Sequence, residues 1–237
     1  MGIVPPDILN SVVPMLPTDY LDFTHTVHRA LFADGEPVWS ALSRIGSYLQ
    51  AELKPAILGD VSPKATVGEQ VFIDEGAVVE ANAVIKGPAW IGRGSHVRSG
   101  AYIRENVIVG EKCVLGNSCE FKNCVLFDNC EVPHFNYVGD AILGYKAHLG
   151  AGVILSNVKL DRLEVVVVHE GQRISTGLRK FSAIIGDHAE IGCNSVVNPG
   201  TLVGRNTIIY PLSSVNGVIP ANSFVKLRQT QEIVQRR

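Results

Sequence analysis

The sequence predicts an all-β solenoid, and two periodic columns of residues carry this prediction. An aliphatic or aromatic residue recurs at every sixth position from Val61 to Phe121, and a column of mostly small residues lies two positions before each of them. This period fits neither an α-helix, which repeats every ~3.6 residues, nor a flat strand, which repeats every ~2. It indicates three short strands per turn of a coil, namely a left-handed parallel β-helix of hexapeptide repeats.

Residues 1–55 carry no repeat, and we expect them to form a helical cap. Apolar residues follow a helix-like spacing over 21–31, after the candidate N-caps Thr18 and Asp19. A second helix is predicted over Pro37–Leu53, where the apolar side chains fall on one stripe. Helices here would cover the open end of the solenoid and its exposed strand edges.

The coil is predicted to begin at residue 56, and its period falters once. Position 133 of the repeat is proline, and the aliphatic column resumes at Val138 and Leu143. One step is therefore five residues long, and we expect it within Pro133–Tyr137. Such an irregularity can re-aim the backbone beside a polar cluster, so this segment is a candidate for chemistry.

The period is lost after Asn157, and a hairpin insertion is predicted over 158–180. Two strand-prone runs, 164–169 and 172–176, flank the turn signal at Glu170 and Gly171. We expect this hairpin to protrude from the coil.

The six-residue period resumes at Ile185 and continues to Val215. The expected order is therefore the cap, a β-helix at 56–224 and a tail at 225–237. The tail is predicted to be helical over Leu227–Gln235.

Charge and hydropathy argue against several classes of partner. The formal net charge is −2, with lysine and arginine dispersed, which gives no reason to expect nucleic acid. No apolar run reaches the length of a membrane span, and the N-terminus lacks the profile of a signal peptide. We therefore expect a cytoplasmic protein without a membrane partner.

The five cysteines predict structural thiols in a reducing compartment. Cys113 and Cys119 fall on the small-residue column, and Cys124, Cys130 and Cys193 lack the spacing of a zinc site. The histidines also lack the spacing of a metal-ligand set, so no metal site is predicted.

Residues 18 apart stack on successive turns of such a coil, about 4.8 Å from each other. Arg104 and Lys122 form such a pair, and each follows an inward residue and so points outward. Two stacked cations favour an anion between them, so they could clamp a phosphate or carboxylate. They could equally be solvated surface charges. Tyr102 and Glu120 stack in a nearby column.

His134 is the histidine best placed to act as a general base. It lies in the irregular segment, near Glu120 in turn count and shortly before Tyr137 and Asp140. A base needs a near-neutral pKa and an orienting acid, which a neighbouring carboxylate supplies. A solvated surface histidine is the alternative interpretation.

Several stretches of the chain resemble a known family. They are Gly116–Lys122 (GNSCEFK), Pro133–Asp140 (PHFNYVGD), Leu149–Gly152 (LGAG) and Asn157. Together they are similar to the acetyltransferase domain of bifunctional N-acetylglucosamine-1-phosphate uridyltransferases. The run Gly171–Asp187 (GQRISTGLRKFSAIIGD) looks most like the archaeal sugar-1-phosphate nucleotidyltransferase branch, and the likeness covers roughly 85–224.

The resemblance implies an N-acetyltransferase that uses acetyl-CoA and needs no metal. His134 would remove a proton from the sugar amine, and Glu120 would orient that histidine. Arg104 and Lys122 would hold the sugar phosphate. The other implied contacts are Tyr137, Asn157 and His148 for the sugar and Ala151, Cys193, Pro211 and Lys180 for acetyl-CoA. Family members are trimers with sites between neighbouring coils, so a homotrimer is expected.

The sequence also departs from the family. The departures are His148 for an asparagine near the substrate, Val158 for a bacterial tyrosine, and Leu163 and Val166 where the archaeal branch has lysines. No glycine-rich nucleotide-binding loop precedes the coil, so uridyl transfer is not expected.

The leading hypothesis is acetyl transfer to the amine of an amino-sugar 1-phosphate, with glucosamine 1-phosphate as first choice, in nucleotide-sugar biosynthesis. One alternative keeps this fold but changes the amino sugar or the acyl chain. Another is a non-catalytic trimeric scaffold, or a sugar-phosphate-binding subunit that partners a separate nucleotidyltransferase.

Overall fold

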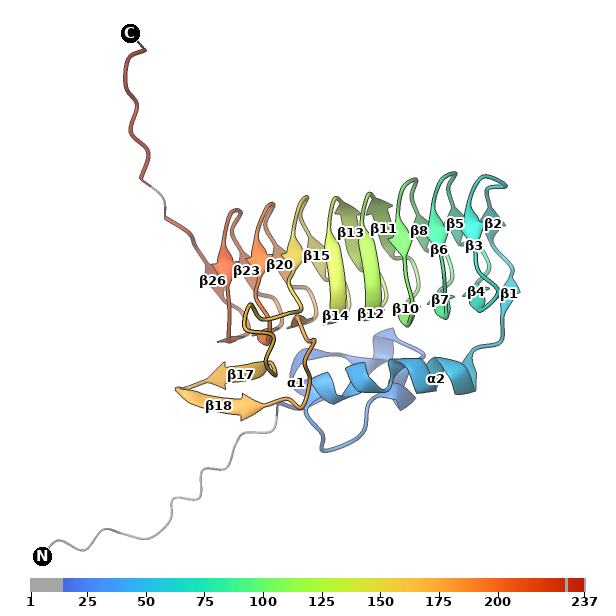
Figure 1. Ribbon diagram of the computed structural model, residues 1–237, viewed down its shortest axis with the longest axis horizontal. Coiled ribbons are helices and arrows are strands. Elements are labelled where there is room, and N and C mark those ends of the chain that lie inside the picture. The colour runs from blue at the N-terminus through green and yellow to red at the C-terminus, as the bar shows by residue number, and fades with distance from the viewer. Residues whose placement is uncertain (1–14, 229, 237) are drawn as a thin grey trace, which may run out of the picture.

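The computed structural model describes residues 15–228 and 230–236. Figure 1 shows one long stack of short strands, with the helices and a two-stranded hairpin along one side. Strands of successive turns pair in parallel, so the molecule is a parallel β-helix, as the six-residue period predicts. None of the helices in these two ranges is long and apolar enough to cross a membrane.

Each regular turn of the coil contributes one strand to each of three faces. The first face contains β1 (Ala56–Ile57), β4 (Val71–Ile73), β7 (Ala89–Ile91), β10 (Val107–Val109), the later parts of β12 (Glu120–Leu126) and β14 (Tyr137–Leu143), β19 (Ala183–Ile185), β22 (Thr201–Val203) and β25 (Val218–Ile219). The second contains β2 (Asp60–Val61), β5 (Val78–Val79), β8 (His96–Val97), β11 (Val114–Asn117), β13 (Glu131–His134), β15 (His148–Leu149), β20 (Glu190–Ile191), β23 (Ile208–Ile209) and β26 (Phe224–Val225). The third contains β3 (Thr66–Val67), β6 (Val84–Ile85), β9 (Tyr102–Ile103), the first parts of β12 and β14, β16 (Ile154–Leu155), β21 (Val196–Val197) and β24 (Ser214–Val215).

The large residue of each repeat points into the coil and builds its core. Ile85, Val97 and Ile103 are fully buried, and small residues such as Ala83 and Ala101 fill the space beside them. Burying one aliphatic side chain completely stabilises a fold by about 1.5–3 kcal/mol. Repetition of this burial on every turn stabilises a coil whose strands are mostly two or three residues long.

The five-residue step predicted within Pro133–Tyr137 is wrong. Phe121 pairs with Ile103, 18 residues earlier, but with Val138, 17 residues later. Val109 likewise pairs with Leu126, 17 residues on. The turns shorten by one residue between Phe121 and Leu126, and again between Val138 and Leu143, since Leu126 also pairs with Leu143.

Phe127 explains why the sequence misplaced this step. It follows Phe121 by six residues and is fully buried, but it belongs to the second core between coil and cap. The inward residues are instead Leu126 and Val132, which lie in the core of the coil. Phe127, which is buried beneath the cap, was therefore mistaken for a member of the inward column.

The cap is built from short helices that lie along the first face of the coil and not over its open end as predicted, and its first part also differs from the prediction. The elements are α1 (Pro17–Tyr20), η1 (Phe23–His25), η2 (Arg29–Leu31), η3 (Val38–Ser43) and α2 (Ile45–Glu52). No continuous helix forms over 21–31, because the Asp22 carboxylate accepts a hydrogen bond from the Thr24 N–H at 3.0 Å and turns the chain locally. The second predicted helix, Pro37–Leu53, is divided into η3 and α2.

The cap and the hairpin share one apolar cluster against the coil. The rings of Trp39 and Phe181 lie 6.1 Å apart between centroids, and the hairpin residues Val165 and Val167 are fully buried in the same cluster. Asp187 adds a polar connection, because its carboxylate accepts hydrogen bonds from the Asp22 N–H at 2.7 Å and the Tyr145 N–H at 2.8 Å.

The predicted hairpin is present, whereas the predicted tail helix is not. Strands β17 (Val166–His169) and β18 (Gln172–Ser175) pair antiparallel and project from the coil (Figure 1). Residues 226–228 and 230–236, the part of the tail that the structure describes, contain neither helix nor strand. A helix this short is marginal in water without a surface to pack against.

Candidate functional site

A buried carboxylate, Asp140, lies at the centre of a polar network on one corner of the coil. Its Oδ1 accepts a hydrogen bond from Asn123 Nδ2 at 3.0 Å, and its Oδ2 accepts one from Asn157 Nδ2 at 2.5 Å. Lys122 Nζ lies 3.5 Å from Oδ1. The Asp140 side chain is 5 % exposed, and such burial is costly unless donors surround the carboxylate, as they do here.

The two shortened turns create this network. Asn123, Asp140 and Asn157 follow one another at intervals of 17 residues, so they stack on successive turns at one corner. Asn123 and Asp140 have φ values of 46° and 52°, in the left-handed region that asparagine and aspartate tolerate better than most residues. Each lies within a long strand, β12 or β14, that bends around the corner without interruption.

Arg104 and Lys122 lie side by side as the sequence predicts, and each has a carboxylate partner. The Arg104 N–H donates to the Phe121 carbonyl, which fixes the stacking of the two residues. Arg104 Nη1 donates to Glu120 Oε1 at 2.9 Å. Lys122 pairs with Asp140 as described. Neither cation is therefore an uncompensated charge.

Glu120 does not make the contact expected of it with His134. Its carboxylate is bound by Arg104, and no hydrogen bond or ion pair joins it to the His134 ring, both residues lying in the described part of the chain. The reason is the register: Glu120 begins β12 on the third face and pairs with Tyr137, whereas His134 ends β13 on the second face.

Tyr137 and Asn157 form the second side of the Asp140 network. The Asn157 amide lies 3.1 Å from Tyr137 Oη as well as donating to Asp140. The Tyr137 ring lies over Gly139, and a Cβ on that glycine would collide with its hydroxyl. Burial, with a smaller contribution from the Asp140 charge, raises the pKa of Tyr137, so the phenol stays protonated at neutral pH.

His134 belongs to a second corner column that also contains three residues predicted for acetyl-CoA. Asn117 pairs with His134, and the next members along the coil are Ala151, Cys193 and Pro211. Backbone hydrogen bonds link each level to the next, including Gly152 N–H to His134 O at 3.0 Å and Asn194 N–H to Ala151 O at 2.8 Å. The His134 side chain is exposed.

A shallow groove of about 290 Å³ lies along the second face beside this column. Its lining includes Gly150, Gly192, Cys193 and Pro211 and is mostly apolar. His148 also lines it, between Glu131 and Glu190 in the sheet, and therefore lies with the residues predicted for acetyl-CoA and not with those predicted for the sugar. Cys193 is exposed, unlike the other four cysteines, which are buried.

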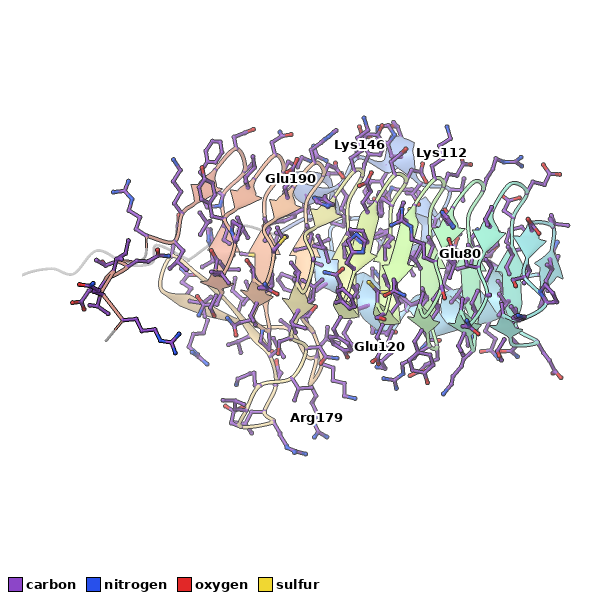
Figure 2. The ribbon with its side chains drawn as sticks, turned by 90° about the horizontal axis from the view of Figure 1, so that it is seen from above. Glu80, Lys112, Glu120, Lys146, Arg179 and Glu190 are labelled. Atoms are coloured by element: carbon purple, nitrogen blue, oxygen red, sulfur yellow. The ribbon has the colours of Figure 1, made fainter. Side chains whose placement is uncertain are left out.

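Lys180 is not brought to this groove. It lies at the base of the hairpin, in a separate pocket of about 700 Å³. The hairpin insertion carries it away from the second face, and Figure 2 shows its neighbour Arg179 out on that projection.

The sequence did not identify two residues of the network as site residues. They are Asp140, at its centre, and Asn123, on the preceding turn. Their signal was the 17-residue spacing of Asn106, Asn123, Asp140 and Asn157, which the assumed period of 18 hides. In residues 15–228 and 230–236 there is no group of three or more histidine, cysteine, aspartate or glutamate side chains that could hold a metal.

The fold and site together define a class: a left-handed parallel β-helix built from hexapeptide repeats. Within this class, residues 85–175 match the family model described as the GMPPB C-terminal domain. The coil is also similar to bifunctional GlmU proteins of archaea and bacteria.

Two archaeal relatives illustrate the extent of the similarity. The bifunctional sugar-1-phosphate nucleotidylyltransferase/acetyltransferase of Sulfurisphaera tokodaii is 38 % identical over 97 residues, which are 41 % of this chain and 24 % of that protein. The bifunctional protein GlmU of Methanococcus vannielii is 34 % identical over 203 residues, 86 % of this chain and 48 % of that protein. The chain thus spans a quarter to a half of the length of these relatives.

Two solved structures are similar to the chain at low identity. The acetyltransferase domain of PglB from Neisseria gonorrhoeae is 18 % identical, with 81 % of this chain and 77 % of that chain covered and a TM-score of 0.37. The UDP-N-acetylglucosamine acyltransferase of Francisella novicida is 15 % identical, with 68 % and 67 % covered and a TM-score of 0.42.

Proposed function

We propose that the chain is a CoA-dependent N-acetyltransferase acting on the amine of a phosphorylated amino sugar, with glucosamine 1-phosphate the first acceptor to test. The position of His134 carries this proposal. It stands in the same column as Ala151, Cys193 and Pro211, and the last two of these line the apolar groove. Across the corner at Phe135 and Asn136, the chain reaches Tyr137 and the Asp140 network.

The mostly apolar groove suits the extended arm of acetyl-CoA, and the polar corner suits a sugar. His134 would take a proton from the sugar ammonium group, and the free amine would attack the acetyl carbonyl carbon. The new C–N bond forms as the C–S bond breaks, and the thiolate of CoA leaves and takes up a proton. Tyr137 and Asn157 would contact sugar hydroxyls, and the Arg104–Glu120 pair would border the phosphate.

The Sulfurisphaera tokodaii relative supports this proposal, since it is a bifunctional sugar-1-phosphate nucleotidylyltransferase and acetyltransferase. The proposal concerns the acetyl transfer, because the residues that it uses lie on the coil. A separate nucleotidyltransferase is a proposed partner that would carry out the nucleotidylyl transfer.

We also propose a homotrimer in which neighbouring coils complete the site. Phe135, beside His134, is 62 % exposed, and Leu212 on the same corner is 55 % exposed, so this edge carries apolar surface that a second copy would cover. Light scattering of the purified protein tests the assembly, and a monomer at micromolar concentration would contradict it.

The decisive test of the activity is release of CoA thiol from acetyl-CoA, with the acetylated product identified by mass spectrometry. We expect release to depend on added glucosamine 1-phosphate or a related amino sugar phosphate. If no amino sugar in a panel is acetylated, the enzyme assignment fails and a non-catalytic binding subunit becomes the better interpretation.

A further inference from the structure

The base of the hairpin forms a large basic pocket that the acetyl-transfer proposal does not use. It has a volume of about 700 Å³ and is lined by Val158, Lys159, Leu160, Arg162, Arg179 and Lys180. Four of these six side chains are cations. They come from the two segments, 158–162 and 179–180, that connect the hairpin to the coil.

The charge of this pocket is poorly compensated. Lys159 pairs with Asp161 at 3.1 Å. Arg162, Arg179 and Lys180 have no ion pair with any carboxylate in the residues that the structure describes. By contrast, Arg104 and Lys122, the cations predicted to clamp a phosphate, are already neutralised by Glu120 and Asp140. A ligand anion is therefore attracted more strongly to the hairpin base than to that pair.

The pocket adjoins the Asp140 network through the backbone on both sides. Val158 directly follows Asn157, whose amide donates to Asp140. Lys180 precedes Phe181, whose N–H donates to the Asn157 carbonyl at 3.1 Å, and the Ser182 N–H donates to the Asp140 carbonyl at 2.9 Å. The pocket therefore lies beside the corner where a sugar would lie. Figure 2 shows Arg179 on the same side of the coil as Glu120.

The pocket is also larger than one phosphate group requires. Pockets of roughly 300–1,000 Å³ accommodate ligands of the size of a nucleotide. Leu160 is fully exposed and Val158 is 39 % exposed, so apolar surface lies beside the cations for a base to contact. Guanidinium groups bind phosphate oxygens in pairs, and a diphosphate offers enough oxygens for Arg162 and Arg179 together.

We propose that this pocket binds the diphosphate of a nucleoside diphosphate or of a nucleotide-linked amino sugar, and that such a sugar is a further acceptor beside the sugar 1-phosphate. The role of that sugar as acetyl acceptor rests on the function proposed above, whereas binding of the nucleotide does not. The acceptor would then be supplied by a reaction that attaches the nucleotide before acetylation.

CoA also carries a diphosphate, so the experiment must distinguish the two sources. Isothermal titration of the full chain is carried out with uridine diphosphate, guanosine diphosphate, CoA and inorganic phosphate. We expect at least one nucleoside diphosphate to bind at least about tenfold more tightly than phosphate, and the double variant Arg162→Ala/Arg179→Ala to weaken it at least about tenfold. CoA affinity should be unchanged in this variant.

The matched control is Arg173→Ala, because Arg173 is an exposed arginine on β18 outside the pocket lining. It should leave every affinity unchanged. No saturable nucleoside diphosphate binding, an equal loss in the control, or a loss confined to CoA would each overturn the proposal.

Acetylation of glucosamine 1-phosphate at the same rate in wild type and double variant, with no activity on the nucleotide-linked sugar, would also overturn the proposal while leaving the acetyltransferase assignment intact. Conversely, nucleotide binding that depends on Arg162 and Arg179 without any acetylation would support the pocket and refute the activity.

Discussion

The Lys122 ammonium lies 3.5 Å from the Asp140 carboxylate, and the two side chains are 16 % and 5 % exposed. Breaking a buried ion pair by removing one charge typically costs about 3–5 kcal/mol, because the other charge is left without compensation. Asp140→Asn also presents amide hydrogens to the amide groups of Asn123 and Asn157, which now donate to the carboxylate. We expect a loss of about 3 kcal/mol in the free energy of unfolding, measured by urea denaturation.

Asp161→Asn is the matched control for that substitution. It also removes a carboxylate from a lysine, but the Asp161 side chain is half exposed. Exposed ion pairs contribute little to stability. Equal destabilisation by the two substitutions would contradict the role given to the Asp140 network.

His134→Ala should lower the rate of acetyl transfer by about 10²–10⁴-fold, the usual contribution of a general base. The His134 side chain is exposed, so its removal should leave the unfolding transition unchanged. The rate is measured as thiol release at saturating acetyl-CoA. His188→Ala, on a different corner of the coil, is the control, and unchanged turnover in His134→Ala would remove the assignment.

The alternation of large and small residues was sufficient to predict the coil and the stacking of Arg104 over Lys122. This succeeded because inward packing depends on local sequence spacing alone. The same rule failed at Phe127, where burial beneath the cap produced an apolar position indistinguishable from an inward one. The assumed repeat was therefore displaced by one residue, and this displacement concealed that Asn123, Asp140 and Asn157 stack at one corner.

Side-chain partners were less predictable than backbone positions. Glu120 was expected to face His134, but the corner between β13 and β14 puts the two on different faces, and Arg104 takes the carboxylate. The resemblance assigned His148 to the sugar and Lys180 to acetyl-CoA. In the structure, His148 lines the groove beside Cys193, and Lys180 lies in the pocket at the base of the hairpin. Such outcomes depend on where loops leave the coil, which spacing does not encode.

Cys193 should be protected from alkylation by the acyl donor. It is an exposed thiol in the groove proposed for the CoA arm, whereas the other four cysteines are buried. We expect iodoacetamide to modify Cys193 first, and saturating CoA to slow this modification at least about tenfold. The modification is followed by mass spectrometry of peptides.

Cys193→Trp and Cys193→Ser separate occlusion of the groove from loss of the thiol. Tryptophan should fill much of the groove of about 290 Å³ and raise the KM for acetyl-CoA, while serine should leave it nearly unchanged. Equal kinetics in the tryptophan variant would show that the donor binds elsewhere.

His28 should make the stability of the cap depend on pH. It is 2 % exposed between cap and coil, with Nδ1 3.0 Å from the Tyr48 hydroxyl, and its ring lies edge-on to Trp90 at 4.9 Å. Nε2 is buried without a hydrogen-bond partner in the described residues. Burial lowers the pKa of His28 from 6.5 to about 4, so the folded protein holds it neutral.

The sign follows from the protons bound in each state. Between pH 6.5 and about 4 the unfolded chain binds a proton at His28 that the folded chain does not, so the free energy of unfolding falls as the pH falls. The full loss is on the order of 3 kcal/mol below pH 4, and none is expected above pH 7. Urea titrations at pH 7 and pH 5 measure the slope. His28→Gln should reduce this slope, whereas the hairpin variant His169→Gln should keep it; a slope that His28→Gln leaves unchanged would assign the pH dependence to other groups.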